Sequence, residues 1–169
     1  EYFLLGTDSL GRSVAKRLIV GIRISLLIAI AATCIDLFIG VTYGLISGYV
    51  GGWLDTLMQR LIEIISSIPN LVIVTMLGLL LGNGLFSIVL AIGLTGWTSM
   101  ARQVRNMTLS YREREFVLAS RTLGEKSWKV AFKHILPNIS GVIIVQIMMS
   151  IPSAIMYEAV LSAINLGVK

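Results

Sequence analysis

The sequence predicts an all-α fold, a polytopic bundle of helices that crosses a lipid membrane several times. Of its 169 residues, 56% are hydrophobic and 14% are charged, and the mean hydropathy is +0.86. Soluble domains contain a larger fraction of charged residues and a smaller fraction of apolar residues than this. Between residues 64 and 104 the only charged side chain is Arg102. That apolar run is about twice the roughly 20 residues that one spanning helix needs.

The apolar runs predict four membrane spans. The second ends at the turn Gly82-Asn83-Gly84, and the third continues as a more polar helix beyond the membrane. Asp36 interrupts the first span. We expect the spans over about residues 25–47, 68–81, 86–101 and 137–157.

The distribution of positive charge predicts the topology. Residues 101–137 hold eight of the fourteen Lys and Arg residues, and positively charged loops stay on the cytoplasmic side. This segment and residues 51–67 are therefore expected inside, and the N-terminal segment outside. The same rule explains the net charge of +5 without a nucleic-acid partner.

Two stretches have the amphipathic spacing of surface helices. Residues 12–23 separate apolar from basic positions, so we expect a helix lying on the outer membrane surface. In residues 53–63, apolar and polar positions alternate in a similar way. They either lie along the inner surface or extend the second span into the cytoplasm.

Glycine spacing predicts close helix contacts. Gly40, Gly44 and Gly48 recur every four residues, so one face of the first span carries no side chains, and Gly78 and Gly82 repeat the pattern. Small residues at this spacing allow helix backbones to approach closely in lipid.

The residues of enzyme active sites and metal centres are missing. Cys34 and His134 are the only residues of their types, so neither a disulfide framework nor a His-based metal site is expected. Residues 124–127, Gly-Glu-Lys-Ser, lack the Gly-Lys pair and the earlier glycine of a phosphate loop. We therefore expect no catalysis and no cofactor in this chain, and His134 is expected to cap a helix or pack at the membrane edge.

The basic segment, residues 101–137, has more regular helical spacing than a simple connecting loop needs. We expect one helical piece over residues 111–123, a break at Gly124, and a second piece over residues 125–135 that Pro137 ends. Lys126, Lys129 and Lys133 share one face of the second piece. Such a knob would either insert into a cleft of a soluble partner or lie as an amphipathic loop on lipid headgroups.

This segment resembles the cytoplasmic EAA loop of permease subunits in binding-protein-dependent ABC importers. That motif is Glu-Ala-Ala, three residues, Gly, nine residues, an apolar position, one residue and Leu-Pro. The spacing matches at Leu118-Ala119-Ser120, at Gly124, and at His134 to Pro137, although Leu118 replaces Glu and Ser120 replaces Ala. Further stretches resemble the C-type subunits of dipeptide and oligopeptide permeases: residues 5–12, 21–26, 48–55, 67–69, 94–97, 112–116 and 158–168.

The resemblance implies a type I ABC importer transmembrane domain. Family members have six spans, so we expect one further helix on each side of this piece, in keeping with its lack of an initial Met. Residues 1–24 would form an extracytoplasmic amphipathic lead-in and residues 25–169 an incomplete permease domain, with the coupling loop at residues 106–137. The subunit would lie as a multi-pass protein in the cell membrane of a bacterium or archaeon.

By the same resemblance the function is that of a permease subunit of an ATP-driven peptide importer, forming half of the translocation path. The expected partners are a homologous second permease, two ABC ATPase subunits that bind ATP and Mg²⁺, an extracytoplasmic substrate-binding protein, the peptide and membrane lipid. Dipeptides, oligopeptides, nickel complexes and signalling peptides all stay open as cargo. The alternative is a membrane scaffold or channel subunit without powered transport.

Two groups of site residues follow from these expectations. Gly124 is expected to set the bend of the coupling loop, because a side chain there would clash or shift the angle. Asp36 is expected to line the path or bind a peptide amine, or else to hydrogen-bond a neighbouring helix, because a carboxylate within a span is costly. The ATPase-coupling set is Glu115, Leu118, Ala119, Ser120, Arg121, Gly124, His134 and Pro137, and the translocation-path set is Asp36, Gln146, Ser150 and Ser153.

Overall fold

The computed structural model of the chain describes residues 3–82 and 84–164. Asn83 of the predicted turn and the end of the stretch 158–168 lie outside the described residues. The all-α prediction is confirmed, with helices in the order α1 (Val14–Val50), α2 (Gly52–Ser66), α3 (Asn70–Leu81), α4 (Leu85–Arg112), α5 (Glu115–Thr122), α6 (Ser127–Val130), the π-helix η1 (Ala131–Ile135) and α7 (Leu136–Ala163).

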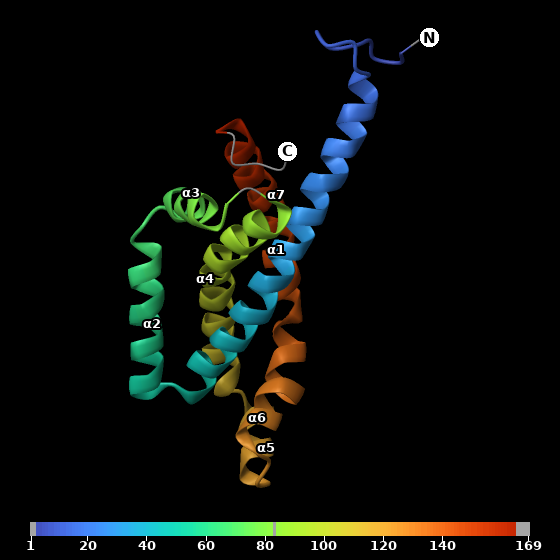
Figure 1. Cartoon of the computed structure of the whole chain (residues 1–169). Coiled ribbons are helices and arrows are strands. Elements are labelled where there is room, and N and C mark those ends of the chain that lie inside the picture. Colours follow the sequence, from blue (N-terminus) through green and yellow to red (C-terminus); the bar gives the residue numbers. More distant parts are fainter. Residues whose placement is uncertain (1–2, 83, 165–169) are drawn as a thin grey trace.

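Three helical segments are long and apolar enough to cross a membrane: α1, α4 and the continuous path from Ser127 to Ala163. The pair α2 and α3 makes a fourth if it counts as one broken span, since the two are bent by 77° around Pro69. A proline disfavours helical geometry in the residue before it, which explains the break. The second span is therefore not one straight helix, and α2 runs upright beside the bundle while α3 lies across its upper part (Figure 1).

The first helix differs from the prediction at its start. No separate surface helix forms over residues 12–23, because α1 is unbroken from Val14 to Val50. The side chain of Ser13 accepts the backbone N–H of Lys16 at 3.4 Å and caps the helix. Residues 14–50 contain no proline, and Gly21, the one glycine within the predicted surface helix, does not stop α1.

The segment before α1 is held by Asp8. Its carboxylate accepts the backbone N–H groups of Leu10 at 3.0 Å and Arg12 at 2.9 Å, and it pairs with Arg17 at 2.6 Å. The Arg12 backbone bond is the strongest influence, and together these bonds outweigh desolvation and lower the pKa of Asp8 to about 2. Part of the stretch 5–12 is thus a self-contained turn that leads into α1.

Helix α1 packs most extensively against α4, and its glycine face is the contact surface. A Cβ at Gly40 would lie 2.6 Å from the Cβ of Met100, and one at Gly44 would lie 2.6 Å from the carbonyl oxygen of Ala101. The predicted glycine face therefore makes a close backbone contact. Gly82 serves the predicted turn after α3 and not the predicted close contact, because its φ is +80° and its Cβ would meet no atom within 4 Å among the described residues.

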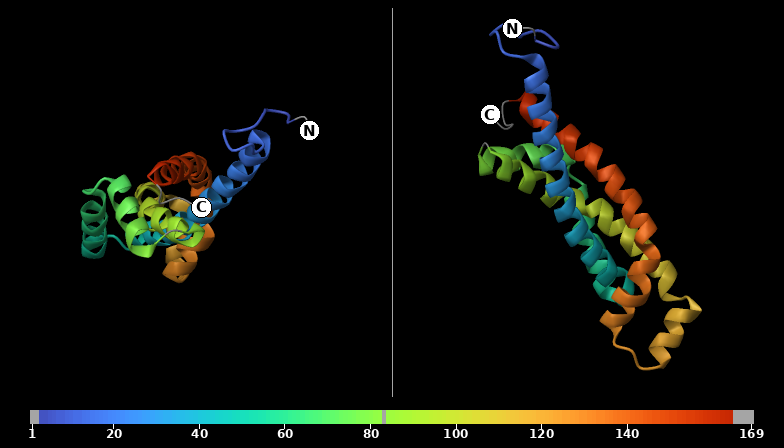
Figure 2. Two further views of the ribbon diagram at one scale, coloured as in Figure 1. Left: turned by 45° about the horizontal axis from the view of Figure 1, so that its top comes forward. Right: turned by 90° about the vertical axis from the view of Figure 1, so that its right-hand side faces the viewer.

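The core has two halves with a polar layer between them. One cluster, around Ile28, Ile88 and Leu161, joins the N-terminal half of α1 to α4 and α7. The other, around Leu45, Met100 and Ile139, joins the same helices at the opposite end. Figure 2 shows these three helices crossing side by side along the length of the bundle.

The basic segment folds differently from the prediction. Residues 111–123 do not form one helix, because α4 continues to Arg112 and the backbone becomes extended at Arg114 (φ −73°, ψ 145°) before α5 starts. This break turns α5 so that Val117 is fully buried in the second cluster. The burial of one apolar side chain, worth about 1.5–3 kcal/mol, favours the turned arrangement.

Pro137 does not end the second helical piece, contrary to the prediction. α6, η1 and α7 are continuous, and Pro137 lies in the first turn of α7. The backbone N–H of Leu136 reaches back five residues to the carbonyl of Ala131. This wider π turn directly precedes the proline, whose ring and missing N–H would otherwise disrupt the regular hydrogen-bond ladder.

A polar clamp ties α2 to α1 and α4. The guanidinium of Arg105 donates to both oxygens of Asp55, at 2.6 and 2.5 Å, and Ser47 donates to the same carboxylate. Both charged side chains are largely buried, so the pair is shielded from solvent. Helix α2 makes few other contacts with the bundle, and we infer that this clamp holds it in place.

We expect Asp55→Asn in the full-length subunit to lower the free energy of unfolding by about 1–3 kcal/mol, because Arg105 would lose a charged partner in a partly buried site. Thermal unfolding in mild detergent would measure this. The matched control is Glu63→Gln, which removes the exposed pair with Arg60 and should change stability by less than about 1 kcal/mol. Equal effects from the two substitutions would contradict the clamp.

Candidate functional site

The first candidate site is the elbow, residues 115–135, which comprises α5, the turn at Gly124, α6 and η1. It forms the end of the bundle farthest from the start of α1 (Figures 1 and 2). The elbow contains or adjoins all the residues predicted to couple to an ATPase. The structure thus brings this set together at one end of the fold.

The elbow bends at Gly124 through a Schellman turn. The N–H of Gly124 donates to the carbonyl of Arg121 at 3.0 Å, and the N–H of Glu125 donates to that of Ser120 at 3.2 Å. Gly124 has φ +80°, a left-handed conformation that other residues rarely adopt. A Cβ there would meet no atom within 4 Å in the described residues. The expected clash is therefore absent, and backbone conformation is the reason for glycine.

Glu125 stabilises the second half of the elbow. This role was not predicted from the sequence. Its Oε2 lies 2.7 Å from Nε2 of His134, and its Oε1 lies 3.8 Å from the ammonium groups of both Lys129 and Lys133. Desolvation opposes ionisation, but the His134 hydrogen bond and the positive charges of Lys133 and Lys129 outweigh it and hold the pKa of Glu125 below its ordinary value. Two of the predicted facial lysines therefore converge on a carboxylate that stays ionised near neutral pH.

The elbow is joined firmly to the bundle. Val117, Val130 and Ile135 are fully buried in the same cluster as Leu45 of α1 and Met100 of α4. The guanidinium of Arg121 lies 5.5 Å from the ring centroid of Tyr49 in α1, in a cation–π contact. Because buried contacts and a continuous helix link it to α7, movement of the elbow would be transmitted to the spans.

The outer face of the elbow remains open in this chain. Among the predicted residues, Ser120 and His134 are half-buried, and Ser120 donates to the carbonyl of Phe116 at 3.0 Å. Leu118 is 45% exposed, Trp128 64% and Leu123 87%. Such apolar exposure beside charged residues is typical of a protein contact surface. The remaining predicted members, Glu115, Ala119, Arg121, Gly124 and Pro137, are all exposed.

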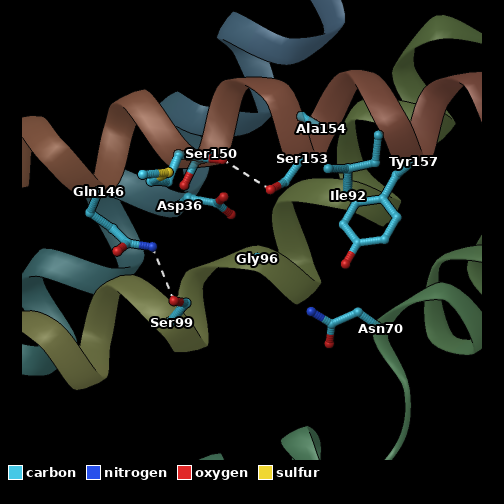
Figure 3. A pocket seen from close by; sticks show the side chains of 11 residues that line it. Asp36, Asn70, Ile92, Gly96, Ser99, Gln146, Ser150, Ser153, Ala154 and Tyr157 are labelled. Carbon is cyan, nitrogen blue, oxygen red and sulfur yellow. Dashed lines mark hydrogen bonds between the residues drawn. The ribbon is translucent and has the colours of Figure 1, made fainter.

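The second candidate site is a cavity of about 380 Å³ in the polar layer between the two core clusters. All four residues predicted for the translocation path line it: Asp36 from α1, and Gln146, Ser150 and Ser153 from α7 (Figure 3). Its size falls in the range of small-molecule sites, about 300–1,000 Å³. The structure therefore joins residues that lie more than a hundred positions apart in the sequence.

The cavity also has lining residues that were not predicted from the sequence, on α3 and α4 as well as on α7. Ser99 of α4 accepts a hydrogen bond from Nε2 of Gln146 at 3.0 Å, while Asn70 of α3 and Tyr157 of α7 close the cavity from the other side (Figure 3). Asn70 and Ser99 also line a second polar cavity of about 490 Å³ that reaches Arg102, Gln103 and Asn106. The two cavities share these two residues, so polar side chains continue from the middle of the bundle toward its basic end.

The helical bundle, its internal polar cavity and the basic elbow at one end define a multi-pass membrane domain of the permease class. Comparison with known proteins agrees. The family model described as "Binding-protein-dependent transport system inner membrane component" matches residues 40–168. The chain belongs to this family.

Curated relatives cover almost the whole chain. The dipeptide transport system permease protein of Lactococcus lactis subsp. cremoris (strain MG1363) is 71% identical over 169 residues, which are 100% of this chain and 49% of that protein. The oligopeptide transport system permease protein of Bacillus subtilis (strain 168) is 47% identical over 163 residues, 96% of this chain and 53% of that protein. The corresponding protein of Escherichia coli (strain K12) is 40% identical over 167 residues, 99% of this chain and 55% of that protein. The chain thus spans about half the length of the curated relatives it matches.

Proposed function

We propose that this chain is part of a permease subunit of an ATP-driven peptide importer in a bacterial cell membrane. The subunit would form half of the translocation path and would itself hydrolyse nothing. The observation that carries the proposal is the elbow: an open, partly apolar face at the basic end of the bundle, fixed by buried contacts to α1, α4 and α7. The names of the relatives, which refer to dipeptide and oligopeptide transport, support peptides as the cargo.

The mechanism follows from the geometry of the elbow. A cytoplasmic ATPase would bind the exposed face of α5 around Leu118 and Ala119. Closure of the ATPase dimer on ATP would move the elbow as one body, because the Schellman turn and the Glu125 contacts fix its shape. The continuous helix from Ser127 to Ala163 would carry that motion to the cavity-lining residues of α7. A homologous second permease would complete the path, and an extracytoplasmic binding protein would deliver the peptide.

The test is mass spectrometry of the proteins that co-purify with the full-length tagged subunit in mild detergent. We expect a second permease and ABC ATPase subunits. A matched sample with Leu118→Asp should lose the ATPase and keep the second permease, because the elbow face is distant from the cavity. Recovery of the subunit alone after gentle crosslinking, in cells that express these partners, would favour the scaffold or channel alternative.

A further inference from the structure

Asp36 is a buried carboxylate that forms no hydrogen bond or ion pair with the residues that the structure describes. It lies near the middle of α1 and is 5% exposed. Its Oδ1 has no hydrogen-bond partner among the residues that the structure describes, so the predicted bond to a neighbouring helix is not found within them. An isolated buried charge is strongly unfavourable. Either the group is kept neutral or a positive charge reaches it.

The neighbouring helix leaves room for this carboxylate. Gly96 of α4 faces Asp36, and a Cβ on Gly96 would lie 2.7 Å from Oδ1 of Asp36. Any larger residue would push the carboxylate away from its present place. Figure 3 shows the Asp36 carboxylate lying above Gly96, between the helices that line the cavity.

The cavity around Asp36 offers neutral hydrogen-bond acceptors. Asp36 is the one charged residue among those that line it. The hydroxyl of Ser153 donates its proton to the carbonyl of Met149 at 2.9 Å, which leaves its lone pairs free to accept. Gln146 donates through Nε2 to Ser99, and its amide also carries an acceptor oxygen. Ser150 lies beside the carboxylate (Figure 3).

This arrangement matches an ammonium group better than a metal ion. Ca²⁺ takes six to eight oxygen ligands, and Mg²⁺ needs a near-ideal octahedron of oxygens that usually includes one or two carboxylates and substrate phosphates. The described residues contain no group of three or more His, Cys, Asp and Glu that could hold a metal ion. A primary ammonium carries one positive charge and three N–H donors, which suits one carboxylate and nearby hydroxyl or amide oxygens.

We propose that Asp36 is the ion-pairing group of a binding subsite for a primary ammonium group of the transported peptide, with Gly96 providing its space. This inference rests on the proposed function for the identity of the ligand. The ammonium belongs either to the amino terminus of the peptide or to a lysine side chain, and the experiment distinguishes the two sources.

A reporter cysteine tests the charge of the cavity without transport. The full-length subunit, in its assembled complex in membrane vesicles, would carry Cys34→Ser and Ser150→Cys. The reaction rates of 2-aminoethyl and 2-sulfonatoethyl methanethiosulfonate, one cationic and one anionic, would then be compared with and without Asp36→Asn. We expect the ratio of cationic to anionic rate to fall at least about tenfold on loss of the carboxylate. Asp36→Ala serves as a second neutral variant, and an unchanged ratio in both would overturn the proposal.

Protection by peptides then identifies the ligand. Alanyl-alanine should slow modification of the reporter cysteine at least about threefold in the protein with Asp36 and not in the Asp36→Asn variant, whereas N-acetyl-alanyl-alanine should not protect. Protection by N-acetyl-alanyl-lysine would assign a lysine side chain as a source, and its absence would assign the amino terminus. Equal protection by acetylated and free alanyl-alanine would overturn the subsite. If peptide import fails although the reagent ratio depends on Asp36, that result would refute the proposed function and not the charge of the subsite.

Discussion

Gly124→Val in the full-length subunit is expected to abolish ATP-dependent peptide uptake, with at least about a tenfold loss, while the protein still inserts into the membrane. Gly124 has φ +80°, and an L-residue in this region loses about 1–2 kcal/mol, more if it is β-branched. Valine would relieve that strain by opening the Schellman turn, and the angle between α5 and α6 would change. Uptake of a radiolabelled dipeptide in cells lacking their own copy would measure the effect.

The matched control is Gly124→Asn, which is close to valine in size but tolerates the left-handed conformation. Because none of the described atoms lies within 4 Å of a Cβ at this position, a steric clash with the described part of the chain would predict no effect from either variant. We expect the asparagine variant to keep at least half of the wild-type uptake. Full activity of the valine variant at normal expression would contradict the role of the turn, and equal loss in both variants would point to contact with the partner instead.

Gly44→Leu is expected to have the largest effect on stability, preventing recovery of a folded subunit, and Gly44→Ala is expected to lower the free energy of unfolding by about 1–3 kcal/mol. A Cβ at Gly44 would lie 2.6 Å from the backbone carbonyl oxygen of Ala101 and 2.7 Å from the Cβ of Val104. Backbone atoms cannot rotate away as side chains can, so α1 and α4 would have to separate along their main contact. Thermal unfolding in detergent, followed by circular dichroism, would measure the change.

Gly21→Ala supplies the control on the same helix. A Cβ at Gly21 would meet no atom within 4 Å among the described residues, and replacing glycine by alanine within a helix normally gains about 0.5–1 kcal/mol. We therefore expect neutral or slightly raised stability. If Gly44→Ala were as well tolerated as Gly21→Ala, the close approach of α1 and α4 would be wrong.

The elbow illustrates how far sequence reasoning extends at this site. The motif spacing located Gly124 and the residues before it, and local turn chemistry at a glycine is a property of neighbouring residues. The break at Arg114 and the passage of the helix through Pro137 were predicted wrongly, and the burial of Val117 was not predicted. Each of these features depends on the shape of the packing surface that α1 and α4 form. No local sequence pattern contains that information.

The cavity likewise combines residues that the sequence predicted with residues that it did not. Asp36, Gln146, Ser150 and Ser153 stood out because polar side chains within spans are costly, and the structure gathers them around one space. Gly96 was named only as part of a family resemblance, and Ser99 and Asn70 gave no such signal. Their importance comes from the crossing of α4 and α3 with α7, which places them opposite Asp36 and Gln146.

Taken alone, the sequence determined the properties that depend on composition and short spacing: a helical membrane protein, the approximate positions of its spans, the glycine face of α1 and the basic segment with its glycine bend. These follow because the transfer of a side chain into lipid and the conformation of a single residue are local energies. Only the tertiary structure decided that α2 and α3 form a bent pair, that Glu125 gathers His134 and two lysines, and that Asp36 faces Gly96 across a polar cavity. Asp36 and Gly96 lie sixty positions apart, so their approach is fixed only when α1 and α4 cross. The bend at Pro69 and the Glu125 contacts involve nearer residues, but they depend on the path that the backbone takes over several helical turns.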